Sequence, residues 1–234
     1  MNEPDLAVGL LWFAAFLFST TVHEAMHAWA AWKGGDPTAY HGGQVSLSPV
    51  PHIRREPIGM VVLPLLTALT QGWAIGWASA PYDPRWAARY PKRAAVMAAA
   101  GPAGNVLIAL AAFIVLKIGL NQDLFMAPPR VSIDSLVMPA GGEGTDFIST
   151  LLSILLMLNV FLAVFNLIPL PPLDGSAVLA LILPERQALQ MQQYAAQPWL
   201  QLVGLAIAWK VFPIISGPLF LVVLRLLHPG EAYG

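Results

Sequence analysis

Residues Leu6–Trp32 read LAVGLLWFAAFLFSTTVHEAMHAWAAW, an apolar run whose ionisable side chains are His23, Glu24 and His27. About 20 consecutive apolar residues are enough for a helix to cross the hydrocarbon core of a bilayer. Ionisable side chains inside such a helix are energetically costly, and they usually mark a functional site. The stretch therefore predicts a membrane-spanning helix that carries a polar site toward its C-terminal end.

The composition of the whole chain agrees with a membrane location. Hydrophobic residues make up 57% of the 234 residues and charged residues make up 11%, less than half of the roughly 25% found in soluble domains. We therefore expect an all-α integral membrane protein, a polytopic helical bundle of about four to six spans. Residues 1–234 are expected to form a single domain, since no soluble segment is long enough to fold alone.

Net charge and cysteine content exclude several classes of function. The formal net charge is -1, so there is no reason to expect a nucleic-acid partner. The chain contains no cysteine, which excludes disulfides, thiolate metal ligands and a cysteine nucleophile.

Three further segments are apolar and long enough to span a bilayer. They are Ala94–Leu116, Phe147–Leu173 and Trp199–Leu227. The last contains Lys210, Pro213 and Pro218, which predicts either one kinked span or two shorter helices. We expect residues 6–183 to form the core that carries the polar site, and residues 187–228 to add one or two accessory spans.

Residues Ile58–Ala80 are also uncharged, but Pro64 and three glycines within them favour a short helix followed by an extended return. Arg54 and Arg55 precede the segment, and further basic residues follow it between residues 85 and 93. Basic residues collect in cytoplasmic loops, so both ends of the segment are expected on one side of the membrane. A re-entrant excursion, buried in protein or lining a wet cavity, is therefore favoured over a simple span.

The loop between the second and third spans sets the expected orientation. Arg130 is its single basic residue, against the acidic residues Asp123, Asp134, Glu143 and Asp146. This loop should therefore lie on the extracytoplasmic side. The first helix then runs inward from an extracytoplasmic N-terminus, and it places His23 and His27 near the cytoplasmic side. The third span also runs inward and brings Asp174 to the same depth.

The loop after the first helix predicts a small sheet. Gln44–Ser48 alternates in polarity after two glycines, which favours a short strand or hairpin. The run GWASAPYDP at residues 76–84 is its expected extended partner. Backbone groups at membrane depth need hydrogen-bond partners, so we expect this re-entrant hairpin to lie beside the polar site, protected by the helices.

His23, Glu24 and His27 form an HExxH pattern. Residues four apart lie on one face of a helix, so both imidazoles can bind one metal ion, while Glu24 is offset by one position and can accept a proton from water. Zinc lowers the pKa of bound water to about 7 and polarises a carbonyl group, which suits hydrolysis of a peptide bond. Proton-translocating carriers also place His and Glu on membrane helices, so a non-hydrolytic carrier stays open as an alternative.

A catalytic zinc ion usually has a third protein ligand. The longer pattern HExxHxxGxxH is excluded because Lys33 occupies its last position. Glu56 and Glu185 lie beside prolines and are unattractive. Asp174 is the better candidate, because a proline-rich break at the end of an uncharged span positions its carboxylate. The alternative is that Asp174 caps a short helix at Ala177–Leu183.

Three predicted spans carry the motifs HEAMH (23–27), AGPAGN (100–105) and FNLIPLPPLDG (165–175). Together these motifs resemble the site-2 protease family of intramembrane zinc metalloproteases. The segments GDPTA, GQVSLSPVPH and GWASAPYDPRWAARYPKRA are similar to its compact bacterial and archaeal branch, and the order is kept from Thr20 to Leu183. The chain reads HIRREP where relatives often read HID, so any role of that aspartate is absent, and no loop is long enough for a PDZ-type domain.

The resemblance implies one Zn²⁺ ion per chain, held by His23, His27 and Asp174, with Glu24 as the general base. It further implies that the amide of Asn166 steadies the substrate carbonyl or its oxyanion, which agrees with the strength of a buried donor where water is scarce.

Four residues of the loop after the first helix are expected to contact substrate. His52 matches a recurrent histidine of the family. Gln44, Val45 and Ser46 lie on the predicted strand, which could pair with an unwound substrate segment by β-addition.

The implied activity is hydrolysis of peptide bonds within or near transmembrane segments of membrane-protein substrates, in a prokaryotic cell membrane. A transmembrane protein and the lipid bilayer are therefore the expected partners. Carriers commonly show internal repeats, and we find none. A family member that binds substrate without cutting it would be expected to lack Glu24, which is present.

Other polar and small residues of the spans have simpler interpretations. Asn105 and Asn159 are expected to form helix-to-helix hydrogen bonds. Gly101 and Pro102 are expected to allow close helix packing or a kink, and His228 is expected on the surface.

Overall fold

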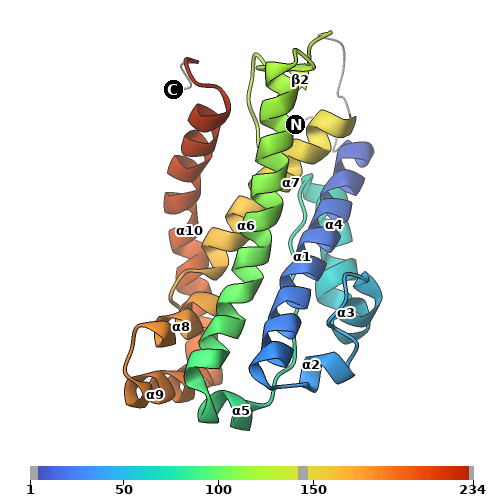
Figure 1. Ribbon diagram of the computed structural model, residues 1–234. Helices are drawn as coiled ribbons and strands as arrows, with labels where there is room; N and C mark the ends of the chain where they lie inside the picture. Colours follow the sequence, from blue (N-terminus) through green and yellow to red (C-terminus); the bar gives the residue numbers. More distant parts are fainter. Residues whose placement is uncertain (1–4, 142–146, 232–234) are drawn as a thin grey trace.

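Figure 1 shows the computed structural model of the protein, which describes residues 5–141 and 147–231. Four long helices dominate this part of the chain. They are α1 (Leu6–Gly34), α6 (Pro91–Asn121), α7 (Phe147–Asn166) and α10 (Pro198–Leu227). Within the described residues, these are the helices long and apolar enough to cross a membrane. They match the four predicted spans, and the prediction of a polytopic helical membrane protein is confirmed.

Helix α6 is the central element of the bundle. In Figure 1 it runs the length of the molecule between α1 and α10, and it contacts both α1 and α7 extensively. Large apolar side chains point outward from the bundle; Leu107 is 60% exposed and Leu202 is 71% exposed. Helices that are apolar on all sides are typical of membrane spans, so this surface fits a bilayer.

At the upper end of the bundle in Figure 1, α6, α7 and α10 pack around an apolar core. Leu116, Met157 and Leu224, one from each helix, are fully buried there. This core anchors the three helices to one another at the end of the bundle away from the HExxH segment.

The loop from α6 to α7 covers this core. It contains the two antiparallel strands of the structure's small sheet, β1 (Phe125–Met126) and β2 (Met138–Pro139). This is the acidic loop of the sequence, in which Glu143 and Asp146 lie outside the described residues.

His228 follows the last turn of α10 and was expected on the surface, but that prediction is wrong. The residue is only 6% exposed, and its Nε2 lies 2.8 Å from Leu136 O. The loop from α6 to α7 folds over the end of α10, so the imidazole is covered.

Helix α7 ends at Asn166 rather than continuing to Leu173. Prolines at 169, 171 and 172 follow. Proline has no backbone N–H to donate and disfavours a helical conformation in the residue before it, so three prolines within four residues end the helix. After the cis peptide bond Pro171–Pro172, the chain forms α8 (Asp174–Val178) and the short 3-10 turn η2 (Leu179–Leu181). The proline-rich break therefore redirects the chain so that Asp174 begins a new helix.

Helix α10 is one continuous helix, which decides between the two alternatives left by Pro213 and Pro218. It packs tightly against the proline-rich turn. A Cβ atom on Gly204 would lie 1.9 Å from Pro171 O, so this contact requires glycine.

Lys92, at the start of α6, forms hydrogen bonds to the segment after α8. Its Nζ donates to Ala180 O and Leu181 O at 2.8 Å each and to Leu183 O at 2.7 Å. Helix carbonyls at a C-terminus lack partners within the helix and attract cations. The ammonium group therefore holds η2 and the start of α9 (Glu185–Ala195) against the bundle.

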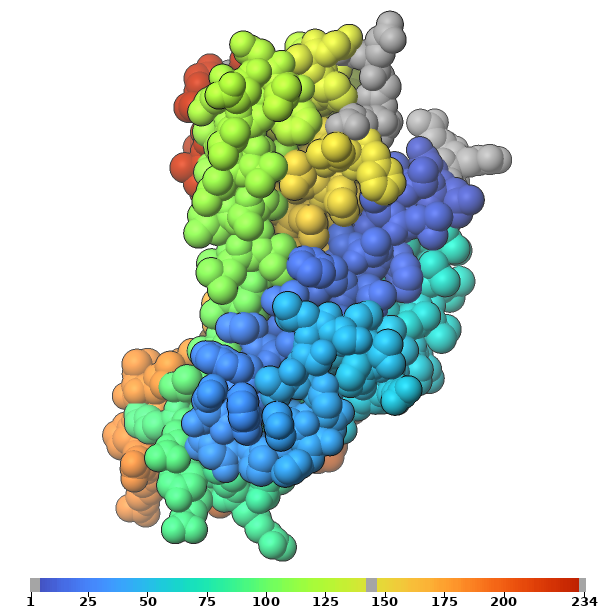
Figure 2. All heavy atoms as spheres, turned by 45° about the vertical axis from the view of Figure 1, so that its right-hand side comes forward, coloured from blue at the N-terminus to red at the C-terminus, as the bar shows by residue number. Residues whose placement is uncertain are grey.

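The chain between α1 and α5 (Pro84–Arg89) has the predicted shape of a short helix with an extended return. It passes through α2 (Thr38–His41), α3 (Pro49–Arg55), the π-helical turn η1 (Ile58–Val62) and α4 (Leu63–Gln71). It is then extended, and Trp77 N donates to Gly59 O at 3.1 Å. The return therefore comes back to the start of the apolar helix. In Figure 2 the segment around α2 and α3 covers the lower part of α1.

The predicted strand at Gln44–Ser48 is wrong. The segment is irregular, with bends at residues 45–47, and the sheet of the described residues is instead the β1–β2 pair at the other end of the molecule. Side chains of this segment form hydrogen bonds to nearby backbone groups. For example, Ser48 Oγ accepts from Val50 N and caps α3. Gln44 Nε2 donates to Ser79 O at 3.2 Å, so the two predicted partners meet through a side chain and not through a backbone ladder.

Asp36 joins the end of α1 to the return segment. Its buried carboxylate accepts hydrogen bonds from Thr38 N at 3.0 Å, Thr38 Oγ1 at 2.5 Å and Asp83 N at 2.7 Å. Burial by itself raises the pKa of Asp36, but these hydrogen bonds outweigh burial and hold the pKa below its ordinary value of 3.8. The ionised carboxylate therefore stabilises the folded state.

The variant Asp36→Asn is expected to unfold at a lower temperature at pH 7, with a loss of about 1–3 kcal/mol from the broken charge-assisted hydrogen bonds. Because the pKa is lower in the folded state, this stabilisation is present above about pH 4 and is lost as the pH falls through the folded pKa. Thermal unfolding at pH 7 and in acid should show a gap between the two proteins that narrows in acid. The variant Glu185→Gln alters an exposed carboxylate and should change little; a gap that does not depend on pH would contradict this role of Asp36.

Candidate metal centre

His23 and His27 on α1 meet Asp174 on α8 at one point. The Nε2 atoms of the two histidines are 3.0 Å apart, and Asp174 Oδ2 lies 3.2 Å from His23 Nε2 and 3.3 Å from His27 Nε2. In the part of the chain that the structure describes, no other group of at least three potential ligands is so compact. The fold thus brings together the three predicted metal ligands.

The spacing of these atoms fits a tetrahedral zinc site. Ligand atoms about 2.0–2.1 Å from a tetrahedral ion lie about 3.3 Å from one another, close to the distances between these three. Asp174 Oδ2 is buried and has no hydrogen-bond partner among the described residues, which is costly for a carboxylate oxygen. A cation between the three atoms would satisfy it, and two imidazoles with one carboxylate leave a fourth position for water.

Each imidazole is held by its other ring nitrogen. His27 Nδ1 lies 2.8 Å from Met97 O, and His23 Nδ1 lies 2.6 Å from Asn105 Oδ1. A backbone carbonyl can only accept, so the proton of His27 is on Nδ1 and its Nε2 keeps a lone pair for a metal ion. Both partners are on α6, so α6 orients the ligands that α1 supplies.

Asp174 is the first residue of α8 and makes no side-chain capping bond; Leu173 occupies the capping position. The alternative prediction that Asp174 serves as a helix cap is therefore wrong. The next residue fixes the turn, because a Cβ atom on Gly175 would lie 2.2 Å from Leu167 O. This close approach directs the carboxylate of Asp174 toward the histidines.

Gly101 lies directly against the cluster. A Cβ atom on this residue would be 2.3 Å from His27 Nε2 and 2.6 Å from His23 Nε2. The predicted role in close helix packing is confirmed, and the neighbours of Gly101 are the Nε2 atoms of the two candidate metal ligands.

Glu24 lies between the two histidines in sequence and is 5% exposed. No hydrogen bond to its carboxylate is found within the described residues. Its oxygens are therefore available to accept a proton from water.

Asn166 is the last residue of α7 and is half-buried. Its Nδ2 donates to Leu162 O, one turn earlier, at 2.9 Å. This bond uses one of the two hydrogens of the amide, so a second hydrogen is left for another acceptor. No hydrogen bond between Asn166 and the His–Asp cluster is found within the described residues.

Three of the four predicted substrate contacts lie on the loop before α3, and the fourth, His52, lies on α3 itself. Gln44 is buried and tied to the return segment, while Val45 and Ser46 are half-buried. His52 on α3 is 1% exposed, and its Nε2 lies 3.1 Å from Ser46 O. None of the hydrogen bonds described for these residues reaches the metal ligands.

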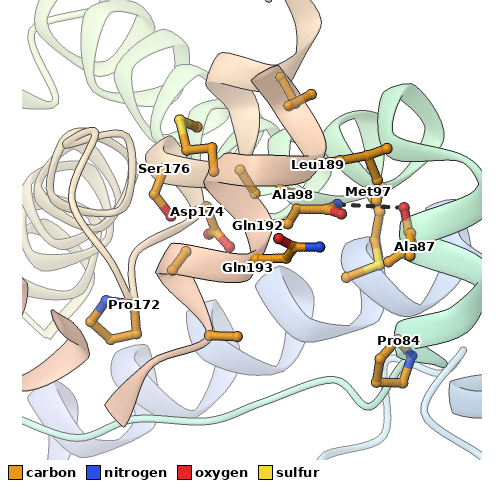
Figure 3. Close-up of a pocket in the computed structure, with 18 of the residues that line it drawn as sticks. Pro84, Ala87, Met97, Ala98, Pro172, Asp174, Ser176, Leu189, Gln192 and Gln193 are labelled. Atoms are coloured by element: carbon orange, nitrogen blue, oxygen red, sulfur yellow. Dashed lines mark hydrogen bonds between the residues drawn. The ribbon is translucent and has the colours of Figure 1, made fainter. Parts of the chain in front are cut away.

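Figure 3 shows a cavity of about 460 Å³ with Asp174 in its wall. The cavity lies between α5, α6, α8 and α9 and is lined by residues that include Met97, Ala98, Gln192 and Gln193. Gln192 Nε2 donates to Ala87 O at 3.5 Å and ties α9 to α5. The carboxylate of the cluster therefore borders a cavity with amide-bearing walls.

Met97 and Asn105 bond to the two histidines of the site, but the sequence alone did not assign either residue to it. Asn105 was predicted to bond across helices, and it does, but one partner is the imidazole of His23. The signal was the position of AGPAGN, since the asparagine follows Gly101 by about one helical turn. Nothing in the sequence singles out the carbonyl of Met97.

The variant Gly101→Ala is expected to lose bound metal, because the added methyl group would occupy the space beside both Nε2 atoms. Metal content per purified chain, measured by elemental analysis, tests this. Gly104→Ala is the matched control on the same helix: its methyl group would meet Met26 Cγ at 2.9 Å, and that flexible side chain can move. Full metal retention by Gly101→Ala would show that the ion binds elsewhere.

The comparisons with known proteins agree with this geometry. The model of Peptidase family M50 matches residues 11–211, a range that includes all three ligands. The chain is 32% identical over 178 residues to "Putative zinc metalloprotease YwhC" of Bacillus subtilis (strain 168), a match covering 76% of this chain and 71% of the relative.

A second relative is "Putative zinc metalloprotease Rip2" of Mycolicibacterium smegmatis (strain ATCC 700084 / mc(2)155). It is 29% identical over 174 residues, which cover 74% of this chain and 58% of the relative, so this chain spans less than two thirds of that protein. No solved structure gives a significant match. With a family match over most of its length and a His–His–Asp cluster in place, the chain belongs to peptidase family M50, the site-2 protease family of metalloproteases.

Proposed function

We propose that this protein is a zinc metalloendopeptidase that cleaves peptide bonds within or near the transmembrane segments of other membrane proteins. The proposal rests on the location of the His23–His27–Asp174 cluster. Both histidines are on α1, a helix long and apolar enough to span a bilayer. Hydrolytic chemistry in such a position suits a substrate that is itself in the membrane. A transmembrane protein and the lipid bilayer are the partners that this proposal requires.

Each residue of the site has a separate role in the proposed hydrolysis. Bound zinc would supply the acidity that makes water nucleophilic near neutral pH and would polarise the scissile carbonyl. Glu24 takes a proton from the attacking water and passes it to the leaving amine, so one water is consumed for each peptide bond broken. Asn166 has an amide hydrogen left to donate to the substrate carbonyl oxygen as negative charge develops there.

The cavity beside Asp174 is the proposed route for water. Gln192 and Gln193 in its wall carry uncharged donors and acceptors that can hydrogen-bond water. The site is proposed to face the cytoplasm, which is supported by the basic residues of α3, α5 and the start of α6 at this end of the bundle. The proposed substrate contacts are still Gln44, Val45 and Ser46, on an irregular loop and not a strand, and His52 on α3.

The variant Glu24→Gln tests the proposed chemistry. It should keep zinc, because Glu24 is not among the ligand atoms, and it should lose cleavage of a model transmembrane substrate by several orders of magnitude because the proton acceptor is gone. Purified wild type and variant would be compared by zinc analysis and by gel detection of cleaved substrate in detergent or liposomes. Equal cleavage by both proteins would refute the role of Glu24, and a wild type that binds zinc and cleaves nothing would favour a substrate-binding pseudoprotease.

The variant Asp174→Ala tests the third ligand. Removing an oxygen that lies within 3.3 Å of both histidines should weaken zinc binding by at least about tenfold, as measured by competition with a fluorescent chelator. Glu185→Ala removes an exposed carboxylate on α9 and serves as the control. Unchanged zinc affinity in Asp174→Ala would remove this residue from the metal site.

A further inference from the structure

A chain of buried side-chain hydrogen bonds runs from the metal site across three helices. It begins at His23 on α1, continues through Asn105 on α6 to Asn159 on α7, and ends at Ser19, one turn before His23 on α1. Both asparagines and Ser19 are 0% exposed, and His23 is 7% exposed. Such a network in an apolar bundle is stable only if every member has a partner.

One backbone carbonyl determines which group donates and which accepts at each step of this series of hydrogen bonds. Asn159 Nδ2 lies 2.8 Å from Leu155 O, and a carbonyl oxygen can only accept. The nitrogen of the Asn159 amide must therefore point toward Leu155, and its second hydrogen goes to Ser19 Oγ at 2.8 Å. This leaves Asn159 Oδ1 as an acceptor.

The orientation of the Asn159 amide in turn determines that of Asn105, and Asn105 determines the protonated nitrogen of His23. Asn105 Nδ2 donates to Asn159 Oδ1 at 2.8 Å, so the Asn105 amide is oriented with its oxygen toward His23. Asn105 Oδ1 accepts from His23 Nδ1 at 2.6 Å. The proton of His23 is thereby held on Nδ1, and Nε2 keeps the lone pair that a metal ion needs.

We propose that Asn159, acting through Asn105, fixes the tautomer of His23 and that both asparagines are positioning residues of the metal centre. The proposal rests on the metal site of the proposed function. His27 needs no such chain, because its partner is the carbonyl of Met97, which can only accept. The amide of Asn105 can present either its oxygen or its nitrogen to an imidazole, so it needs Asn159 to select the oxygen.

The consequence is a specific pattern of zinc affinities. Without Asn159, the Asn105 amide is free to turn its nitrogen to His23, which favours the tautomer with a proton on Nε2 and opposes metal binding. Asn159→Leu is therefore expected to weaken zinc binding, and Asn105→Leu to weaken it by about 10–100-fold, as for other partners of metal-binding histidines. Asn105→Asp keeps an acceptor for His23, since a carboxylate has no nitrogen to present.

The decisive variant combines Asn159→Leu with Asn105→Asp. In this double variant the ionised carboxylate facing His23 can only accept, whatever stands at position 159, so zinc affinity should return to within a few fold of the wild type. A role in helix packing alone predicts the opposite, because two buried residues are then altered instead of one. Chelator competition on the full purified chain measures all five proteins, wild type and four variants.

Ser153→Ala is the matched control on α7. Ser153 is 0% exposed, and its Oγ bonds to Ser149 O and Leu136 N, away from the site, so its loss should leave zinc affinity unchanged. If Asn159→Leu does not fold, the contrast between Asn105→Asp and Asn105→Leu still decides the matter. Equal affinities in those two variants, or no recovery in the double variant, would overturn the proposal. A wild type that binds no zinc would instead refute the proposed function.

Discussion

Ionisable groups are costly inside an apolar helix bundle unless each has a partner. The architecture around His23, His27 and Asp174 follows from this constraint. The outer nitrogens of the two imidazoles donate to oxygen atoms of α6, and the inner nitrogens converge on a carboxylate oxygen that has no hydrogen-bond partner among the described residues. A cation at that point would satisfy all three groups together, which is the arrangement expected of a metal site.

Small residues make this arrangement possible. Helix α6 can bring its hydrogen-bonding groups close to α1 because Gly101 has no side chain where the two Nε2 atoms lie. Gly175 and Gly204 act in the same way at the proline-rich turn, where α8 and α10 meet backbone carbonyls at short range. Close helix contact through small residues is common in membrane proteins, and here it leaves room for chemistry between the helices.

Much of this could be predicted from the sequence, because the strongest signals were local. The four spans follow from apolar length, and His23, Glu24 and His27 follow from helical spacing. Asp174 was placed by proline chemistry, which acts within a few residues. The strand at Gln44–Ser48 failed because a short alternating pattern does not distinguish a ladder from side chains that bond to nearby backbone groups. Asn105 and Met97 could not be assigned to the site, since their roles depend on how α6 is rotated against α1, and a nearly uniform apolar surface does not encode that rotation.

The ligands of the metal site are far apart in the chain, and this affects the order in which the protein is made. Synthesis proceeds from the N-terminus, so the histidine pair of α1 enters the membrane well before Asp174 and the α8 turn have been translated. A nascent chain at that stage therefore carries His23, Glu24 and His27 but lacks Asp174, the third candidate ligand. The candidate metal centre is therefore complete only when α6 and α7 are in place and the proline-rich turn has brought Asp174 against α1.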